Sequence, residues 1–454
     1  MSSVLPFDVI ALIIDIVGDN NDLDLLKALA LVSHSFLQIC NNHLFATVEL
    51  HDAVPMGRTS SKKGFVKLLN TRPDVVKYIR KLTYNVSQNN YFQLDDLFVP
   101  VVDKDDQLLS PVLPNLLQTI SQLNCLVINA SNSDWTALDS SLTSALLHLM
   151  HLPTINHIDL SFIQKLPLSS LTPCVNLRQL DIHTLVTEDD DDGSPEIVQS
   201  EMPRIRQFYT EDSSLLTRKL LHAKRQDGQP ALDFTDLKQL AMSFTRLEDR
   251  QNIQYLLQNA KLLEKLHLLV ERDRLSLVGF HDILSPTART LKVLEFTVPL
   301  CDGFGQAPLA GLCEELEAMA GYHTLEALAF QVNIEGHETE DVIGSIIHKV
   351  EKVLVKPGWS ALKQVSFKLS IACCLVSRET SAKLRETLQS LPDNYLSHLS
   401  KSDSVAFNYS AYIMKCAFND WARLKYCIST FLGFEILIFP FYVSFAVYLA
   451  CCTL

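Results

Sequence analysis

The sequence lacks the short motifs that mark common hydrolase and metalloprotease sites. There is no G-x-S-x-G, which places a nucleophilic serine on a strand-to-helix turn. There is also no H-E-x-x-H, which places two zinc-binding histidines on one helix face. The 14 histidines are dispersed, and the carboxylates are too numerous to indicate acid–base chemistry without geometry. We therefore expect a protein that is not an enzyme, with no catalytic residue, no cofactor and no metal site.

Cysteines in paired spacing are also missing. The 11 cysteines are odd in number and none stands in C-x-x-C spacing, so neither a disulfide framework nor a zinc knuckle is indicated. We expect most of them to be small buried hydrophobic side chains in a reducing compartment, the cytoplasm or the nucleus. The N-terminus carries Asp8 and Asp15 and no basic segment, so we expect no signal peptide.

Clustered basic residues are scarce as well. The formal net charge of −13 argues against binding to a phosphate backbone, so no nucleic-acid partner is expected. The same charge disfavours docking on an anionic lipid surface. Hydrophobic residues make up 47% and charged residues 20% of the chain, which is typical of a folded protein. Its 454 residues allow two or three domains.

Three short amphipathic helices are predicted between Leu5 and Leu50. Pro6 suits the start of the first helix, and the Gly18–Asn21 segment should end it. Asp22 and Ser33 are expected to cap the second and third helices. The apolar faces consist of Ile10, Ile13, Ile14 and Val17, then Leu25, Leu26, Leu29 and Val32, then Phe36, Ile39, Cys40, His43 and Leu44. So small a bundle barely closes a core, which predicts an exposed apolar face for a partner. The alternative is an ordinary helical cap on the region that follows.

These residues resemble an F-box, the module that docks substrate receptors onto the Skp-type adaptor of cullin–RING ubiquitin ligases. The matching segments are Leu5-Pro6, Ile13-Ile14, Leu31-Val32-Ser33 with Phe36, and the ending His43–Leu50, which is similar to F-box-like proteins of mushroom-forming fungi. Phe36 stands where the family usually has Trp. The resemblance implies that the adaptor is bound through Leu5, Pro6, Ile10, Ile13, Leu31, Val32 and Phe36.

A second pattern recurs from residue 76 onward. It consists of an apolar residue, two variable residues, an apolar residue, one variable residue and a third apolar residue. Ten segments carry it, the fifth in a degenerate form: Ile79–Tyr84, Leu123–Ile128, Ile155–Leu160, Leu177–Ile182, Ile205–Phe208, Leu237–Met242, Leu263–Leu268, Leu291–Phe296, Leu325–Phe330 and Leu362–Phe367. Helical spacing occurs between copies, at Ser141–Met150, Asp249–Asn259, Leu312–Ala320 and Val342–Val353.

This L-x-x-L-x-L core resembles a leucine-rich repeat, in which a short strand points alternate side chains into a solenoid core and a helix returns. The uneven spacing predicts irregular curvature and long loops. The alternative is a generic α/β domain in which the copies are parallel strands. After the last copy we expect a helix over residues 383–390, a turn at Pro392-Asp393 and a closing strand over residues 405–415.

Several loops interrupt the repeats. Gln88–Ser110 and Glu188–Gly193 are acidic; the second suits calcium or a basic partner by charge, but its spacing is not an EF-hand, and a solvated loop is the favoured interpretation. Asp302–Pro308 contains a lone G-x-G without the third glycine of a dinucleotide site. Gly336–Asp341 places carboxylates beside a histidine on a polar loop.

The last part of the chain has a different composition. Residues 436–454 carry no charge and as a helix would span about 28 Å, near the thickness of a bilayer core. Three interpretations stay open: a membrane tail anchor, a packed terminal segment, or a translated stretch outside the natural coding sequence.

The fold class expected is α/β, with an N-terminal three-helix F-box followed by an irregular leucine-rich-repeat-like solenoid. The expected division is an F-box-like module at 1–50, a linker and helix at 51–75, the repeats at 76–415 and a hydrophobic extension at 416–454. The expected function is that of a substrate receptor of an SCF-type ubiquitin ligase, which binds a Skp-type adaptor and an unidentified protein target. The alternative is a non-catalytic repeat scaffold, free or tail-anchored.

Overall fold

The computed structural model describes residues 6–51, 61–86, 112–185, 202–225, 227–244, 247–270, 277–301, 311–335, 340–373, 378–402 and 405–415. The predictions for Leu5, for the loops at 88–110, 188–193 and 302–308, for most of the loop at 336–341 and for the extension at 416–454 lie outside these residues. None of the helices within the described ranges is long and apolar enough to cross a membrane.

Twelve strands form one sheet in which the spatial order of the strands is their order in the chain. All eleven neighbouring pairs are parallel. The strands are β1 (Thr47–His51), β2 (Lys81–Asn85), β3 (Cys125–Asp134), β4 (His157–Gln164), β5 (Gln179–His183), β6 (Gln207–Glu211), β7 (Gln239–Ser243), β8 (Lys265–Leu269), β9 (Val293–Cys301), β10 (Ala327–Glu335), β11 (Gln364–Cys373) and β12 (Ala406–Lys415). The chain is therefore a mixed α/β protein built on a parallel sheet.

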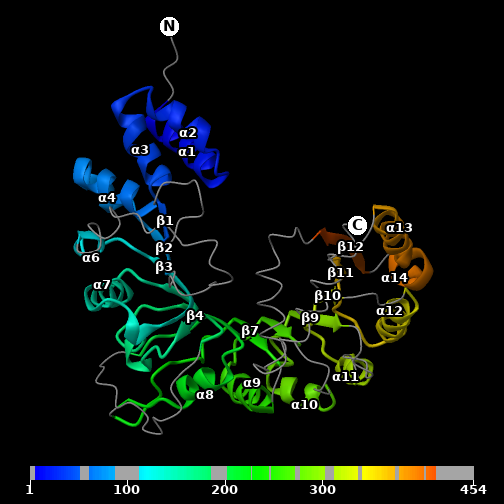
Figure 1. Ribbon diagram of the computed structural model, residues 1–454. Helices are drawn as coiled ribbons and strands as arrows, with labels where there is room; N and C mark the ends of the chain where they lie inside the picture. Colours follow the sequence, from blue (N-terminus) through cyan, green and yellow to red (C-terminus); the bar gives the residue numbers. More distant parts are fainter. Residues whose placement is uncertain are drawn as a thin grey trace, which may run out of the picture.

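Helices connect most of the strands and lie on one side of the sheet. Figure 1 shows the sheet as an arc, with helices along its outer side and the three N-terminal helices beyond β1. The α-helices are α1 (Phe7–Asp19), α2 (Leu23–Ala30), α3 (His34–Leu44), α4 (Ser61–Thr71), α6 (Val112–Leu117), α7 (Ser140–Met150), α8 (Ser214–His222), α9 (Leu247–Asn259), α10 (Phe280–Leu284), α11 (Leu312–Met319), α12 (Glu340–Leu354), α13 (Arg378–Tyr395) and α14 (Ser397–Ser400).

Each of the ten predicted segments supplies a strand, and its apolar residues are buried. In β8, for example, Leu266 and Leu268 are fully buried, as is Leu263 just before the strand, whereas Lys265 and His267 lie on the opposite face. This alternation is the two-residue period of a strand whose one face packs on a core. The prediction of strands is confirmed. The variable residues of the pattern point to the other face of the sheet. We call this second face the open face.

Neighbouring strands join through the same backbone contact throughout. The carbonyl of Lys238, the residue directly before β7, illustrates this contact because it accepts the N–H groups of both Glu264 and Lys265, at the start of β8. Equivalent pairs of bonds run from β2 to β11, ending with Lys363 and Gln364 on the carbonyl of Glu326. Adjacent strands pair without a shift in register over at least their first four residues, so equivalent positions become neighbours in space.

The predicted helices are also present, with small shifts at their ends. α7, α9, α11 and α12 coincide with the four segments of helical spacing, and α4 extends the expected helix before Pro73. The strand β1 was not expected. It pairs with β2, so the domain boundary predicted at residue 50 falls inside β1.

The prediction of a turn at Pro392 is wrong, because α13 continues through this proline to Tyr395. Proline lacks an N–H group, so the carbonyl of Leu388 loses its helical donor. The hydroxyl of Tyr409, from β12, donates a hydrogen bond to that carbonyl at 2.7 Å. Burial raises the pKa of this hydroxyl, so it keeps its proton. A side chain from a distant strand therefore replaces the missing backbone donor.

Replacing Tyr409 with Phe should leave the Leu388 carbonyl without this donor. We expect Tyr409→Phe to lower the free energy of unfolding by about 1–3 kcal/mol, the usual cost of a buried unsatisfied polar group. Tyr412→Phe, at a more exposed position of the same strand, is the matched control and should have a much smaller effect. Urea unfolding of both variants measures the difference. Equal losses for the two variants would refute the assignment.

Candidate functional site: an exposed apolar surface and a polar strand face

The three N-terminal helices form a small core of their own. Ile14, Leu26 and Cys40, one from each helix, are fully buried at its centre. The carboxylate of Asp22 and the hydroxyl of Ser33 accept hydrogen bonds from the N–H groups of Leu25 and Phe36, so both predicted caps are confirmed. This core is separate from that of the sheet.

A glycine lets the first and third helices approach each other. A Cβ atom on Gly18 would lie 2.1 Å from Nδ1 of His43, which is far inside van der Waals contact. The other ring nitrogen of His43 makes a 2.8 Å hydrogen bond with the carboxylate of Asp15. Gly18 was expected to break the first helix; it lies inside α1 instead, and its missing side chain makes room for the imidazole.

The outer surface of these helices is apolar. Among the described residues, nine of the fifteen exposed large hydrophobic side chains lie between residues 7 and 32. We call this set the apolar surface: Phe7, Val9, Leu12, Ile13, Ile16, Leu23, Leu25, Leu31 and Val32. Leu31 is 88% exposed and Val32 64%, although both are large aliphatic residues. So many exposed apolar side chains within one small module are typical of a region that binds a protein.

The residues predicted to bind a partner divide into two groups. Pro6, Ile13, Leu31 and Val32 are exposed. In contrast, Ile10 and Phe36 are half-buried against the core of the three helices. Leu5 lies outside the described residues.

Six members of the apolar surface were not among the residues predicted to bind a partner. They are Phe7, Val9, Leu12, Ile16, Leu23 and Leu25. The signal was present: α1, with the sequence FDVIALIIDIVGD, is apolar on nearly all sides. A helix of that composition is either enclosed by protein or binds a partner with the face its own fold leaves uncovered.

The open face of the sheet carries a row of acidic and imidazole groups. His157 on β4 is bonded to Asp181 on β5 at 2.9 Å, and His183 on β5 is bonded to Glu211 on β6 at 3.0 Å. Tyr209 donates a hydrogen bond to the same Glu211 carboxylate at 3.2 Å. The partners occupy strands next to each other, so the row results from the uniform register.

These pairs shift the ionisation of their members. Burial by itself would lower the pKa of His157, but hydrogen bonds, chiefly to Asp181, raise it to about 9. The hydrogen bond from His183 lowers the pKa of Glu211. The nearby His267 lacks such a carboxylate bond, and burial lowers its pKa. The open face therefore holds charged and neutral imidazoles within a few strands.

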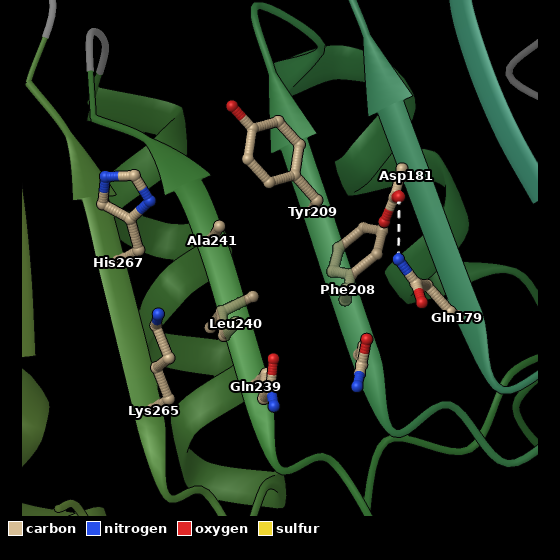
Figure 2. A pocket seen from close by; sticks show the side chains of 10 residues that line it. Gln179, Asp181, Phe208, Tyr209, Gln239, Leu240, Ala241, Lys265 and His267 are labelled. Atoms are coloured by element: carbon tan, nitrogen blue, oxygen red, sulfur yellow. Dashed lines mark hydrogen bonds between the residues drawn. The ribbon is translucent and has the colours of Figure 1, made fainter. Parts of the chain in front are cut away.

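A hollow of about 220 Å³ lies on the open face across β5 to β8. Figure 2 shows Tyr209 and His267 on either side of the small Ala241, which forms the floor between them. Gln207, Gln239 and Lys265 occupy one row of equivalent register positions below. The hollow thus offers amide, ammonium and hydroxyl groups to a polar partner segment.

Neither a metal site nor a similarity to known proteins gives a further indication of function. No group of three or more histidine, cysteine or acidic side chains within the described ranges could hold a metal ion. A scan against protein-family models and a search of curated proteins found no match to this chain.

The raised pKa of His157 predicts a pH-dependent contribution to stability. Because its folded-state pKa lies above the unfolded value, the contribution should be fully present below about pH 6.5 and lost as the pH rises through about 9. Urea unfolding of the wild type and His157→Gln at a series of pH values measures it. The difference between the two should shrink across this window.

His267→Gln is the control of opposite sign. Its imidazole has a lowered pKa, so its charging opposes folding as the pH falls through the unfolded value of about 6.5. As the pH falls, the wild type should therefore gain stability relative to His157→Gln between about pH 9 and 6.5, and lose stability relative to His267→Gln below about pH 6.5. A pH-independent difference for His157→Gln would contradict the assignment.

Proposed function

We propose that this chain is a non-catalytic substrate receptor of an SCF-type ubiquitin ligase, located in the cytoplasm or nucleus. In this proposal α1, α2 and α3 are an F-box-like module that binds a Skp-type adaptor. The sheet and its helices are a leucine-rich-repeat-like solenoid that binds a protein target. The covalent chemistry belongs to other subunits, and this chain raises the local concentration of the target near the ubiquitin-loaded enzyme.

The apolar surface is the observation that carries the proposal. It contains Ile13, Leu31 and Val32, which the F-box resemblance assigns to the adaptor. The core of the three helices is already closed without these side chains, since Ile14, Leu26 and Cys40 fill it. Their exposure therefore serves no internal packing, and a protein partner would remove it from water.

The joint between the two parts supports the same proposal. Two residues, Phe45 and Ala46, separate α3 from β1. Leu44 packs against the core of the three helices, whereas the next residue, Phe45, packs against the core of the sheet. The carbonyl of Ala46 also accepts the N–H groups of Arg80 and Lys81. A short joint packed on both sides would hold a target at a fixed direction from the adaptor.

The test is binding of the purified full chain to a purified Skp-type adaptor. We expect the double variant Leu31→Asp/Val32→Asp to weaken binding at least about a hundredfold, because burying each side chain contributes about 1.5–3 kcal/mol and about 1.4 kcal/mol is tenfold in Kd. Isothermal titration calorimetry measures the change.

The matched control is Leu262→Asp/Val355→Asp, which places the same two charges on exposed apolar positions of the repeat region. This variant should bind the adaptor like the wild type. Far-UV circular dichroism verifies that both variants fold. If the wild-type chain does not bind the adaptor, the ligase proposal fails and the scaffold alternative takes its place.

A further inference from the structure

Three side chains from successive strands form a cysteine–histidine–aspartate chain on the open face. Sγ of Cys125, the first residue of β3, lies 3.3 Å from Nδ1 of His157 on β4. Nε2 of the same imidazole lies 2.9 Å from Oδ2 of Asp181 on β5. The sequence separations are 32 and 24 residues, so the fold alone brings these groups together. Neither the adaptor surface nor the proposed target binding needs this arrangement.

The contacts of the imidazole orient it between the other two groups. Nε2–H of His157 donates to the Asp181 carboxylate, and Nδ1 is the ring atom that faces the Cys125 thiol. Asp181 is itself positioned by the amide of Gln179, which donates to the same carboxylate oxygen at 2.9 Å. A histidine that a carboxylate orients and holds charged next to a cysteine is an arrangement that activates thiols in proteins.

The imidazole beside the thiol is positively charged at neutral pH. Hydrogen bonds of His157, chiefly to Asp181, raise its pKa to about 9. A positive charge 3.3 Å from Sγ of Cys125 favours a thiolate over a thiol at that position. Lys81 of β2 occupies the register position next to Cys125 and adds a positive charge to the same face.

We propose that Cys125 is a reactive thiol that forms a mixed disulfide with low-molecular-weight disulfides. The Cys125 thiol releases its proton to water, and the thiolate, paired with the His157 imidazolium, attacks one sulfur of the reagent. The new Sγ–S bond forms as the S–S bond of the reagent breaks, and the leaving thiolate takes up a proton from water. Cys125 is oxidised and half of the reagent is reduced to its thiol, so no other reactant is needed.

Other cysteines of the chain provide the internal comparison. Cys40 is fully buried and Cys174 nearly so, whereas Cys125 keeps 9% of its surface exposed. Cys313 is more accessible, but burial and the nearby Glu314 raise the pKa of its thiol. The greater exposure of Cys313 favours reaction at that thiol, whereas the His157 imidazole beside Sγ favours reaction at Cys125. The relative rates of the two thiols at low pH therefore distinguish the two effects.

The experiment treats the reduced full chain with hydroxyethyl disulfide, quenches with acid and measures adducts at each cysteine by peptide mass spectrometry. For Cys125, the rate at about pH 6.5 should lie within about threefold of the rate at about pH 8.5, because the His157 imidazolium lies beside Sγ at both pH values. An ordinary thiol slows about fiftyfold between these pH values. Cys313 should show the steep fall.

Variants separate activation from simple access. His157→Gln and Asp181→Asn should each slow the Cys125 reaction at about pH 6.5 by about tenfold or more, and restore the steep pH dependence. His222→Gln, a remote histidine on α8, should leave the rate unchanged. If the variants do not fold, the wild-type pH profile decides by itself. A steep fall for Cys125, or no adduct at either pH, would overturn the proposal.

Discussion

The structure depends on one contact that recurs along the sheet: a backbone carbonyl at the start of one strand accepts two N–H groups from the next. No repeat can bury its own apolar residues, so each strand completes the core of its neighbour. Because the contact recurs without a register shift, side chains at equivalent positions stack. Phe296, Phe330 and Phe367 show this within the core, where successive rings lie 5.7 and 4.9 Å apart and are stacked.

The same uniform register creates the chemistry of the open face. Hydrogen bonds from His157 to Asp181 and from His183 to Glu211 each join adjacent strands, and the Cys125 contact extends the row by one more. The side chains come from variable positions, where no packing requirement acts. The scaffold therefore sets the distances, and the variable residues set the ionisation and reactivity. The hollow and the cysteine–histidine–aspartate chain meet at β5, where Asp181 lines the hollow and also binds His157.

The three-helix module obeys a different constraint. It is too small to enclose all of its apolar side chains, so its outer face remains hydrophobic. Its attachment is nevertheless close, since Leu44 and Phe45 pack into two different cores. A short joint that packs on both sides is what the proposed receptor would need in order to present one protein to another.

The sequence by itself determined every strand except β1, most helices and both caps at Asp22 and Ser33, because these depend on local periodicity and on hydrogen bonds three residues away. The tertiary structure decided the rest. It showed that α13 passes through Pro392, since the compensating donor, Tyr409, comes from another strand. It selected the exposed face of α1, whose composition is apolar on nearly all sides. It also brought Cys125, His157 and Asp181 together, because repeats of unequal length conceal which positions become neighbours until the register is known.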